Sequence, residues 1–249
     1  KFLRLEFKLG SIDELRALML DALTLRGIGS EDAAFIVDDF LDAELEGHKT
    51  HGVSKFLTID IGLSGREGSI EIVSRIGGHT KIDGHRELGH IAARQAAALS
   101  VELAKEHGVG LVALTNVSRY ARLVPYSRLI AERGCIGIVM NNGGPAHVVP
   151  FGGSMPVFGT NPLSFGFPQG EKPPLIFDFA TAQGVWGELR QAIVEERPLP
   201  ERTFLDAAGA FTTDPQRVQG VLPFGGARGA ALCMALEILT GAFVGAKMG

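Results

Sequence analysis

Apolar residues recur at helical spacing in two segments near the N-terminus. Ser11 is followed three residues later by Glu14 and then by apolar positions three and four residues apart, which predicts a capped helix ending near Gly27. Ser30 precedes a second amphipathic segment, which Gly47 ends, so we expect a second helix with Ser30 as its cap. The chain is therefore expected to begin with a helical segment, which we assign to residues 1–70.

The pattern changes to alternating helices and strands in the rest of the chain, which we assign to one α/β core over residues 71–249. Uncharged, β-branched runs predict buried strands at 109–116 and 135–142, and residues 198–220 look like a polar connection. Edge strands are expected at 70–73 and 80–83, further strands at 159–168 and 173–181, and helices at 88–107, 125–133, 186–196 and 229–245.

Composition narrows the class of protein. The 249 residues are 45% hydrophobic and carry a net charge of −4, so nothing in the overall charge indicates binding to nucleic acid or to an anionic membrane. No run approaches the length of a membrane span, and residues 1–11 lack the apolar stretch of a signal peptide. Cys135 and Cys233 lie in apolar contexts typical of free thiols, so we expect a cytoplasmic protein.

The segment 47–53, GHKTHGV, contains the first candidate chemistry. Histidine is the side chain best suited to exchange a proton near pH 7, so His48 or His51 could act as a general acid. Three-residue spacing at the end of a helix would put both on one face, where they could also bind a metal, although no third ligand lies nearby in the sequence. Caps or surface histidines are the third possibility.

Asp178 is an acid inside the apolar run 173–181. A carboxylate buried there needs a partner, and a histidine would be oriented and kept protonated by it. A cap for the turn at Thr181 explains the residue equally well.

Glycine-rich turns and two arginines complete the candidates. Glycines at 143–144, 152–153 and 225–226 would let backbone approach a ligand, and Arg228 just before a helix could hold a phosphate or carboxylate. None of these turns matches a Rossmann or P-loop motif. Arg119 and Arg122 follow a predicted strand, where they could bind an anionic substrate or face solvent.

Taken in order, the motifs GHKTHGVSKF, DGHRELGH, HGVGLVALTNVSRY, GCIGIVMNN, GTNPLSF, FDFAT and LPFGGARG resemble the type-2 malate/L-lactate dehydrogenase family. The resemblance runs from about Ser11 to Gly245. It implies a non-Rossmann α/β fold with a mixed sheet, a homodimer, no metal, and hydride transfer between NAD or NADP and a small carboxylate substrate, namely a 2-keto, 2-hydroxy or cyclic imino acid.

The resemblance also implies roles for individual residues. His51 matches the family's proton donor and acceptor, and Asp178 matches its carboxylate partner. Substrate binding is implied for Lys55, which replaces a usual arginine and so loses the bidentate fork, and for His48, Arg119 and Thr160. Cofactor binding is implied for Asn142, Asn161, Pro174, Leu175, Ile176, Phe177, Phe179, Ala180, Ala227 and Arg228.

Besides Lys55, the sequence departs from the family pattern at four places, one of which is Asn142, where a serine is common. Arg119 stands where a histidine is usual, Ala227 stands where another histidine is usual, and a C-terminal segment that closes over the cofactor is not found before Gly249. These departures keep a second hypothesis open, in which a diverged member without redox activity acts as a cofactor-independent enzyme or a binding protein.

Overall fold

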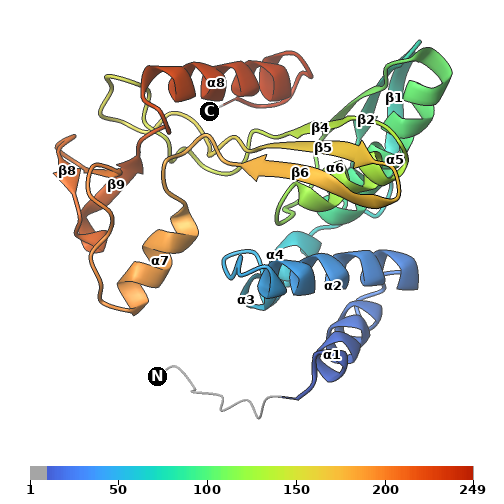
Figure 1. The fold of residues 1–249 in the computed structure, drawn as a ribbon, viewed down its shortest axis with the longest axis horizontal. Coiled ribbons are helices and arrows are strands. Elements are labelled where there is room, and N and C mark those ends of the chain that lie inside the picture. Colours follow the sequence, from blue (N-terminus) through green and yellow to red (C-terminus); the bar gives the residue numbers. More distant parts are fainter. Residues whose placement is uncertain (1–9, 249) are drawn as a thin grey trace. The chain divides into compact units, whose positions relative to one another are not determined.

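The computed structural model describes residues 10–248, so most of residues 1–11, which are expected not to form a signal peptide, lie outside the described residues. The chain divides into two compact units, Lys1–Ile61 and Gly62–Gly249 (Figure 1).

The first unit is helical. Helix α1 (Ile12–Thr24) begins with the predicted capping box, because the Ser11 hydroxyl accepts from the Glu14 N–H at 3.1 Å and the Glu14 carboxylate accepts from the Ser11 N–H at 2.8 Å. Helix α2 (Ser30–Leu45) starts one residue earlier than expected, since Gly29 rather than Ser30 is its N-cap. Two short helices follow, α3 (Val53–Phe56) and α4 (Ile59–Leu63).

Sheet A opens the second unit. Strands β1 (Glu71–Ile76) and β2 (His79–Asp83) pair antiparallel, and β2 pairs parallel with β3 (Leu111–Thr115), so the sheet is mixed. Helix α5 (Gly89–His107) connects β2 to β3 and packs against β3, and Gly108 ends it in the left-handed conformation, as predicted.

Sheet B is antiparallel and consists of β4 (Gly137–Met140), β5 (Leu163–Gln169) and β6 (Lys172–Phe179). Helix α6 (Val124–Glu132) covers one of its faces. Helix α6 and strand β5 approach each other closely. The Ser127 hydroxyl lies 2.7 Å from that of Ser164, and an added Cβ at Gly166 would lie 2.2 Å from the Ser127 carbonyl.

Residues 198–220 form a small sheet, so the expectation of a polar connection is wrong. Strand β7 (Phe204–Asp206) pairs antiparallel with β8 (Phe211–Thr212) and with β9 (Val218–Val221), and a 3-10 turn, Pro215–Arg217, lies between β8 and β9. Phe204 is fully buried in a cluster that also receives helix α7 (Trp186–Val194).

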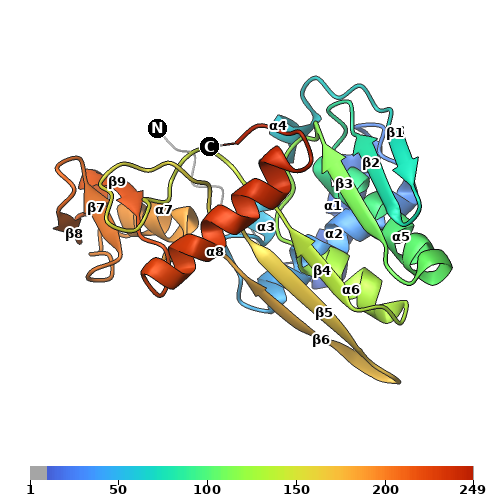
Figure 2. The same ribbon diagram turned by 90° about the horizontal axis from the view of Figure 1, so that it is seen from above.

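The last helix, α8 (Ala227–Glu237), starts two residues before the predicted helix and continues as a π-helical turn, Ile238–Ala242 (Figure 2). Among residues 10–248, no helix is long and apolar enough to span a bilayer. The expected α/β fold with a mixed sheet and an N-terminal helical segment is confirmed.

The expectation that 109–116 and 135–142 form buried strands is only half correct. Both strands exist, but β3 buries only Ala113 and β4 buries only Gly137 completely. Their apolar composition fits a strand that is covered on both faces and paired on both edges. Each is instead the terminal strand of its own sheet.

Candidate active site

The two histidines of the N-terminal motif lie in the turn between α2 and α3, not on a helix as expected. The His51 N–H donates to the His48 carbonyl at 2.8 Å, and Nδ1 of the half-buried His51 ring lies 3.0 Å from the Thr50 hydroxyl. His48 is exposed. In residues 10–248 no three His, Cys, Asp or Glu side chains are grouped so as to hold a metal ion.

Helix α2 fixes the end of this turn. The Glu44 carboxylate accepts from the Val53 N–H at 3.0 Å, and it packs so closely on Gly52 that an added Cβ would lie 2.1 Å from it. Phe56 then packs edge-to-face on Phe40, with ring centroids 5.5 Å apart, and so holds α3 and its half-buried Lys55 against α2. The histidine motif is therefore a turn fixed to α2 at its end, and Lys55 follows it on α3.

Asp178 lies near the end of β6 directly opposite Ser164, and it is exposed, so the expected burial of this carboxylate is wrong. Opposed residues of paired strands project to the same face. Because Ser164 contacts Ser127 of α6, Asp178 leaves β6 on the side of that helix. It is exposed because β6 is the outermost strand of sheet B.

The neighbours of Asp178 along β6 present apolar side chains to the opposite face. Leu175, Phe177 and Phe179 are 43%, 49% and 39% exposed. Phe177 packs edge-on against Phe167 of β5, and the Phe179 ring makes a similar contact with Phe224, with centroids 6.1 Å apart in both cases. The other members of this run, Pro174, Ile176 and Ala180, are half-buried. Strand β6 thus combines an apolar surface with one carboxylate.

The Gly159–Pro162 segment, which precedes β5 in the chain, makes hydrogen bonds both to Thr181, just after β6, and to α8. The Thr160 carbonyl accepts from both the N–H and the hydroxyl of Thr181, at 2.9 and 3.0 Å. Asn161 adopts a left-handed conformation with φ 36°, and its fully buried amide donates to the Glu237 carboxylate at 2.7 Å and to the Cys233 carbonyl at 3.1 Å. Burial raises the pKa of the Cys233 thiol.

Helix α8 begins in a tight glycine turn. Gly225 and Gly226 both have positive φ, and an added Cβ at Gly229 would lie 1.7 Å from the Phe224 carbonyl. The N–H groups of the first turn, at Ala227, Arg228 and Gly229, have no acceptor within the helix, and the Arg228 side chain is exposed beside them. Donors, a helix N-terminus and a cation at one place suit a phosphate group.

Two further predicted residues lie on other loops of this unit. Asn142 follows β4, and its amide donates to the Lys247 carbonyl at 2.8 Å. Arg119 is exposed in the loop after β3. That loop is held by the Ser118 N–H, which donates to the Glu87 carbonyl at 2.9 Å, while the buried Glu87 carboxylate pairs with Arg66.

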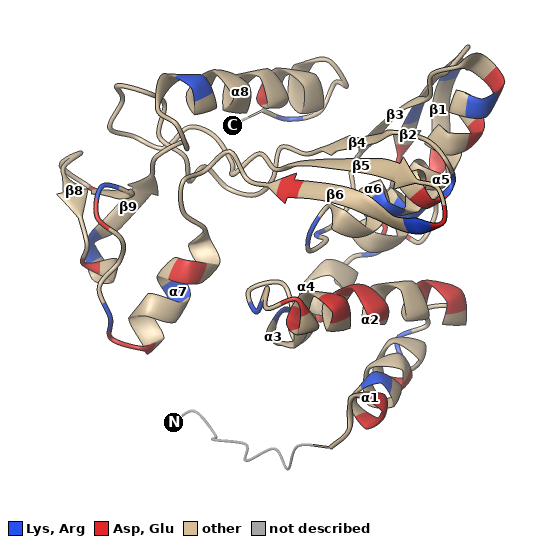
Figure 3. Cartoon of the chain, in the orientation of Figure 1, with Lys and Arg blue, Asp and Glu red and all other residues tan. Residues whose placement is uncertain are grey.

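The second unit therefore brings Thr160, Asn161, the end of β6 and the start of α8 into one connected group, whereas His48, His51 and Lys55 belong to the first unit. Sequence reasoning missed Glu237, which is 2% exposed. The available signal was a single acid within the apolar run 230–239. Figure 3 shows that acidic residues also gather on α2.

Comparison with known proteins gives a consistent result. The family model for malate/L-lactate dehydrogenase matches residues 11–249. The malate/(S)-sulfolactate dehydrogenase of Methanothermus fervidus is 35% identical over 96% of this chain and 72% of its own length. A delta(1)-pyrroline-2-carboxylate reductase of Burkholderia multivorans is 33% identical over 94% of this chain and 71% of its own length.

A solved structure supports the same relationship. The sulfolactate dehydrogenase of Methanocaldococcus jannaschii superposes with a TM-score of 0.85 at 34% identity, over 95% of this chain and 70% of that one.

Proposed function

Because the chain belongs to the malate/L-lactate dehydrogenase family, we propose that it is an oxidoreductase that uses NADH or NADPH to reduce the carbonyl or imine carbon of a small 2-keto or cyclic imino acid, or catalyses the reverse oxidation. Its relatives include both hydroxy-acid dehydrogenases and imine reductases, so activity of this general type is supported at the level of the family. The cofactor supplies the hydride and its two electrons.

His51 is the proposed proton donor. Reduction of C=O adds a hydride to carbon and a proton to oxygen, and an imidazolium is well suited to deliver that proton near pH 7. The Thr50 hydroxyl lies 3.0 Å from Nδ1 of this ring. We further propose Asp178, which is exposed near the end of β6, as the carboxylate of the catalytic set, as the resemblance implies.

The substrate carboxylate would be held by cations. Lys55 is half-buried in α3 and offers one ammonium, and Arg119 offers a guanidinium that can bind a carboxylate with two parallel hydrogen bonds. His48 and Thr160 complete the proposed substrate-binding set. An additional arginine in place of the usual histidine favours a substrate with a second acidic group.

The cofactor would be held by β6 and the start of α8. The observation that carries this assignment is the ring contact between Phe179 and Phe224, because it links the apolar surface of β6 to the glycine turn whose helix N-terminus and Arg228 suit a phosphate. Asn142, Asn161, Pro174 to Phe177, Ala180 and Ala227 are the other proposed members. With its amide donating internally, Asn161 would serve by holding its loop in place.

We also propose a cytoplasmic homodimer. The support for a dimer is the family resemblance alone. Static light scattering of the purified protein tests it, and a mass equal to one chain at micromolar concentration would contradict it.

The function is tested by titrating the protein with NADH and NADPH while following fluorescence and thermal stability. Micromolar binding of either supports the proposal and leads to a screen of 2-keto and cyclic imino acids. Arg119 and Ala227 favour one alternative, a member without hydride transfer, because both replace residues usual in the family. A folded protein that binds neither nucleotide would support that alternative.

A further inference from the structure

The loop that carries Arg119 follows the carboxyl end of β3. Strands β2 and β3 are parallel, and Asp83 lies opposite Thr115, so both strands end at the same edge of sheet A. Ligands of α/β proteins commonly bind beyond the carboxyl ends of parallel strands. The Arg119 side chain is exposed in this loop, so whatever fixes the loop backbone also decides where the guanidinium can reach.

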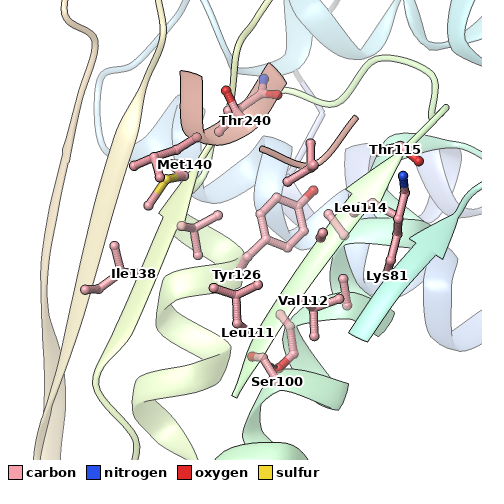
Figure 4. Close-up of a pocket in the computed structure, with 18 of the residues that line it drawn as sticks. Lys81, Ser100, Leu111, Val112, Leu114, Thr115, Tyr126, Ile138, Met140 and Thr240 are labelled. Carbon is pink, nitrogen blue, oxygen red and sulfur yellow. Dashed lines mark hydrogen bonds between the residues drawn. The ribbon is translucent and has the colours of Figure 1, made fainter. Parts of the chain in front are cut away.

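One side of the loop borders open space. Thr115, Asn116 and Tyr120 line a cavity of about 1590 Å³, to which residues of both β3 and β4 contribute (Figure 4). A loop beside a cavity makes few packing contacts on that side, so its position depends on the contacts that it makes elsewhere.

The turn 84–88, which follows β2, bonds to the backbone of this loop. The Arg86 N–H donates to the Asn116 carbonyl at 2.8 Å, and the Ser118 N–H donates to the Glu87 carbonyl at 2.9 Å. The first bond runs from the turn to the loop and the second runs from the loop to the turn. Together they fix the loop as far as the residue before the arginine.

Helix α5 approaches the loop closely at its first residue. A Cβ added to Gly89 would lie 2.4 Å from the Ser118 carbonyl oxygen and 2.5 Å from the Tyr120 ring, so only glycine allows this approach. The Gly89 N–H also donates to the Ser118 hydroxyl at 3.3 Å. The loop is therefore held at the two residues that flank Arg119.

Side chains anchor the turn 84–88 to the segment before β1. The Glu87 carboxylate is 3% exposed and pairs with both Nε and Nη2 of Arg66, the latter at 3.1 Å. It also accepts from the Leu88 N–H at 2.6 Å. A bidentate pair fixes the orientation of its partners as well as their distance, so Arg66 determines the position of the turn.

The backbone of the turn is strained. His85 and Arg86 both adopt left-handed conformations, with φ 43° and 60°, which residues other than glycine rarely take. Such a conformation persists only where surrounding contacts impose it, and it is most common at functional sites. The ion pair between Arg66 and Glu87 supplies such a contact.

We propose that Arg66 and Glu87 are positioning residues. Through the turn 84–88 they hold Arg119 where its guanidinium binds the second acidic group of the substrate with two parallel hydrogen bonds. This inference rests on the proposed function, since it concerns the same substrate site. Arg119 contacts the substrate directly, whereas Arg66 and Glu87 act through Arg119.

A role of this kind has a distinct kinetic effect. The second acidic group is remote from the reacting carbon, so a contact with it is equally strong in the bound substrate and in the transition state. Loss of such a contact raises KM and leaves kcat unchanged. A substrate without the second acidic group should be unaffected, whereas loss of an ion pair that merely stabilised the fold would affect every substrate alike.

The test compares the reduction of oxaloacetate with that of 2-oxobutanoate, which has a methyl group in place of the second carboxylate. We expect Arg66→Ala to raise the KM for oxaloacetate by at least about tenfold, the effect of one lost charged hydrogen-bonding contact, and to leave kcat and the KM for 2-oxobutanoate unchanged. Arg66→Lys keeps a charge beside Glu87 but loses the bidentate contact, so it should raise the KM for oxaloacetate about threefold. Arg66→Lys also carries the test if Arg66→Ala does not fold.

Two further variants locate the effect. Arg75→Ala is the matched control, because it removes an exposed arginine of β1 that pairs with Glu106 of α5, and it should change neither KM. In a protein that already carries Arg119→Ala, adding Arg66→Ala should raise the KM for oxaloacetate no further, because the side chain that Arg66 positions is absent.

A measurement without substrate follows the loop itself. In Arg66→Ala, amide hydrogen exchange measured by NMR should be at least about tenfold faster at Ser118, because its N–H bonds to the Glu87 carbonyl of the loosened turn. Exchange at Leu111, whose N–H bonds to the turn between β1 and β2, should not change. This readout does not depend on turnover.

The results that would overturn this proposal differ from those that would overturn the proposed function. Unchanged exchange at Ser118 in a folded Arg66 variant would overturn the positioning role, and so would an equal rise in KM for both substrates. A protein that reduces 2-oxobutanoate or a cyclic imino acid but not oxaloacetate would also overturn it, and would leave the proposed function standing. A protein that binds neither NADH nor NADPH would overturn both.

Discussion

The amide of Asn161 donates to the carboxylate of Glu237 at 2.7 Å, and both side chains are at most 2% exposed. This contact joins the loop after Gly159 to the end of α8 across 76 positions of sequence. A buried carboxylate depends on such donors, since burial of a charge is costly when its hydrogen bonds are lost.

We expect Asn161→Ala to destabilise the protein by about 2 kcal/mol, because it removes a donor from the buried Glu237 carboxylate and from the Cys233 carbonyl. The Tm should fall by on the order of 5 °C. Asn142→Ala is the matched control, since this half-buried amide makes a hydrogen bond to Lys247 near the surface, and it should cost less than about 1 kcal/mol. If the two variants lost the same stability in thermal unfolding, the buried hydrogen bonds of Asn161 would contribute no more than the surface hydrogen bond of Asn142.

His51→Ala should reduce kcat/KM by at least about a hundredfold, because general acid catalysis typically contributes that much. His107→Ala, which changes an exposed histidine at the end of α5, should leave turnover unchanged. Turnover is followed by nucleotide absorbance with the best substrate from the screen. Unchanged turnover in a folded His51→Ala protein would remove His51 from the mechanism.

Arg228→Ala should weaken NADH or NADPH binding about tenfold, which corresponds to about 1.4 kcal/mol, through loss of one cation at the start of α8. The matched control is Arg133→Ala, which removes an exposed arginine at the end of α6. The nucleotide Kd of this variant should match that of the unmodified protein. Titration at two salt concentrations adds a check, because the contribution of Arg228 should shrink as salt rises. Identical Kd values for both variants would exclude Arg228 from the nucleotide site.

His147 stacks on Trp186, with ring centroids 3.9 Å apart and planes at 11°, and burial lowers the pKa of His147 below its usual 6.5. A nearby positive charge at Arg190 acts in the same direction. The unfolded chain therefore binds this proton more readily than the fold does, so the stability that the neutral ring contributes is present above pH 6.5 and is lost as pH falls below it.

Because Trp186 is the single tryptophan, its fluorescence reports this titration directly. We expect a midpoint below pH 6.5, with quenching on the acidic side as the imidazole becomes protonated. His147→Phe keeps an aromatic stack and should abolish the transition. A midpoint above 6.5 would contradict the assignment of the shift to burial.

The sequence predicted the positions of helices and strands better than it predicted how they pack and which side chains they bury. Ser11 and Gly108 marked helix ends correctly, because capping is a local property of a few neighbouring residues. The exposure of Asp178 could not be predicted in the same way. It depends on β6 being the outermost strand of sheet B, which is decided by pairing between distant segments.

The candidate site shows the same difference between local properties and contacts of distant segments. The resemblance supplied candidate residues, but the buried Glu237 and its contact with Asn161 were not anticipated, since the two residues are distant in sequence. The strands of residues 204–221 were missed because Phe204 is one of few apolar residues there, and its burial comes from packing against α7 and Val148. Such packing leaves little periodic signal in a short segment.

The pairing of the strands also has a consequence for the order of folding. All contacts within sheet A lie inside residues 71–115, and all pairing within sheet B lies inside residues 137–179, so each sheet closes only short loops. Short loops close quickly and at low entropic cost. During synthesis each sheet can therefore form as soon as its own segment is available, before the rest of the chain has been made.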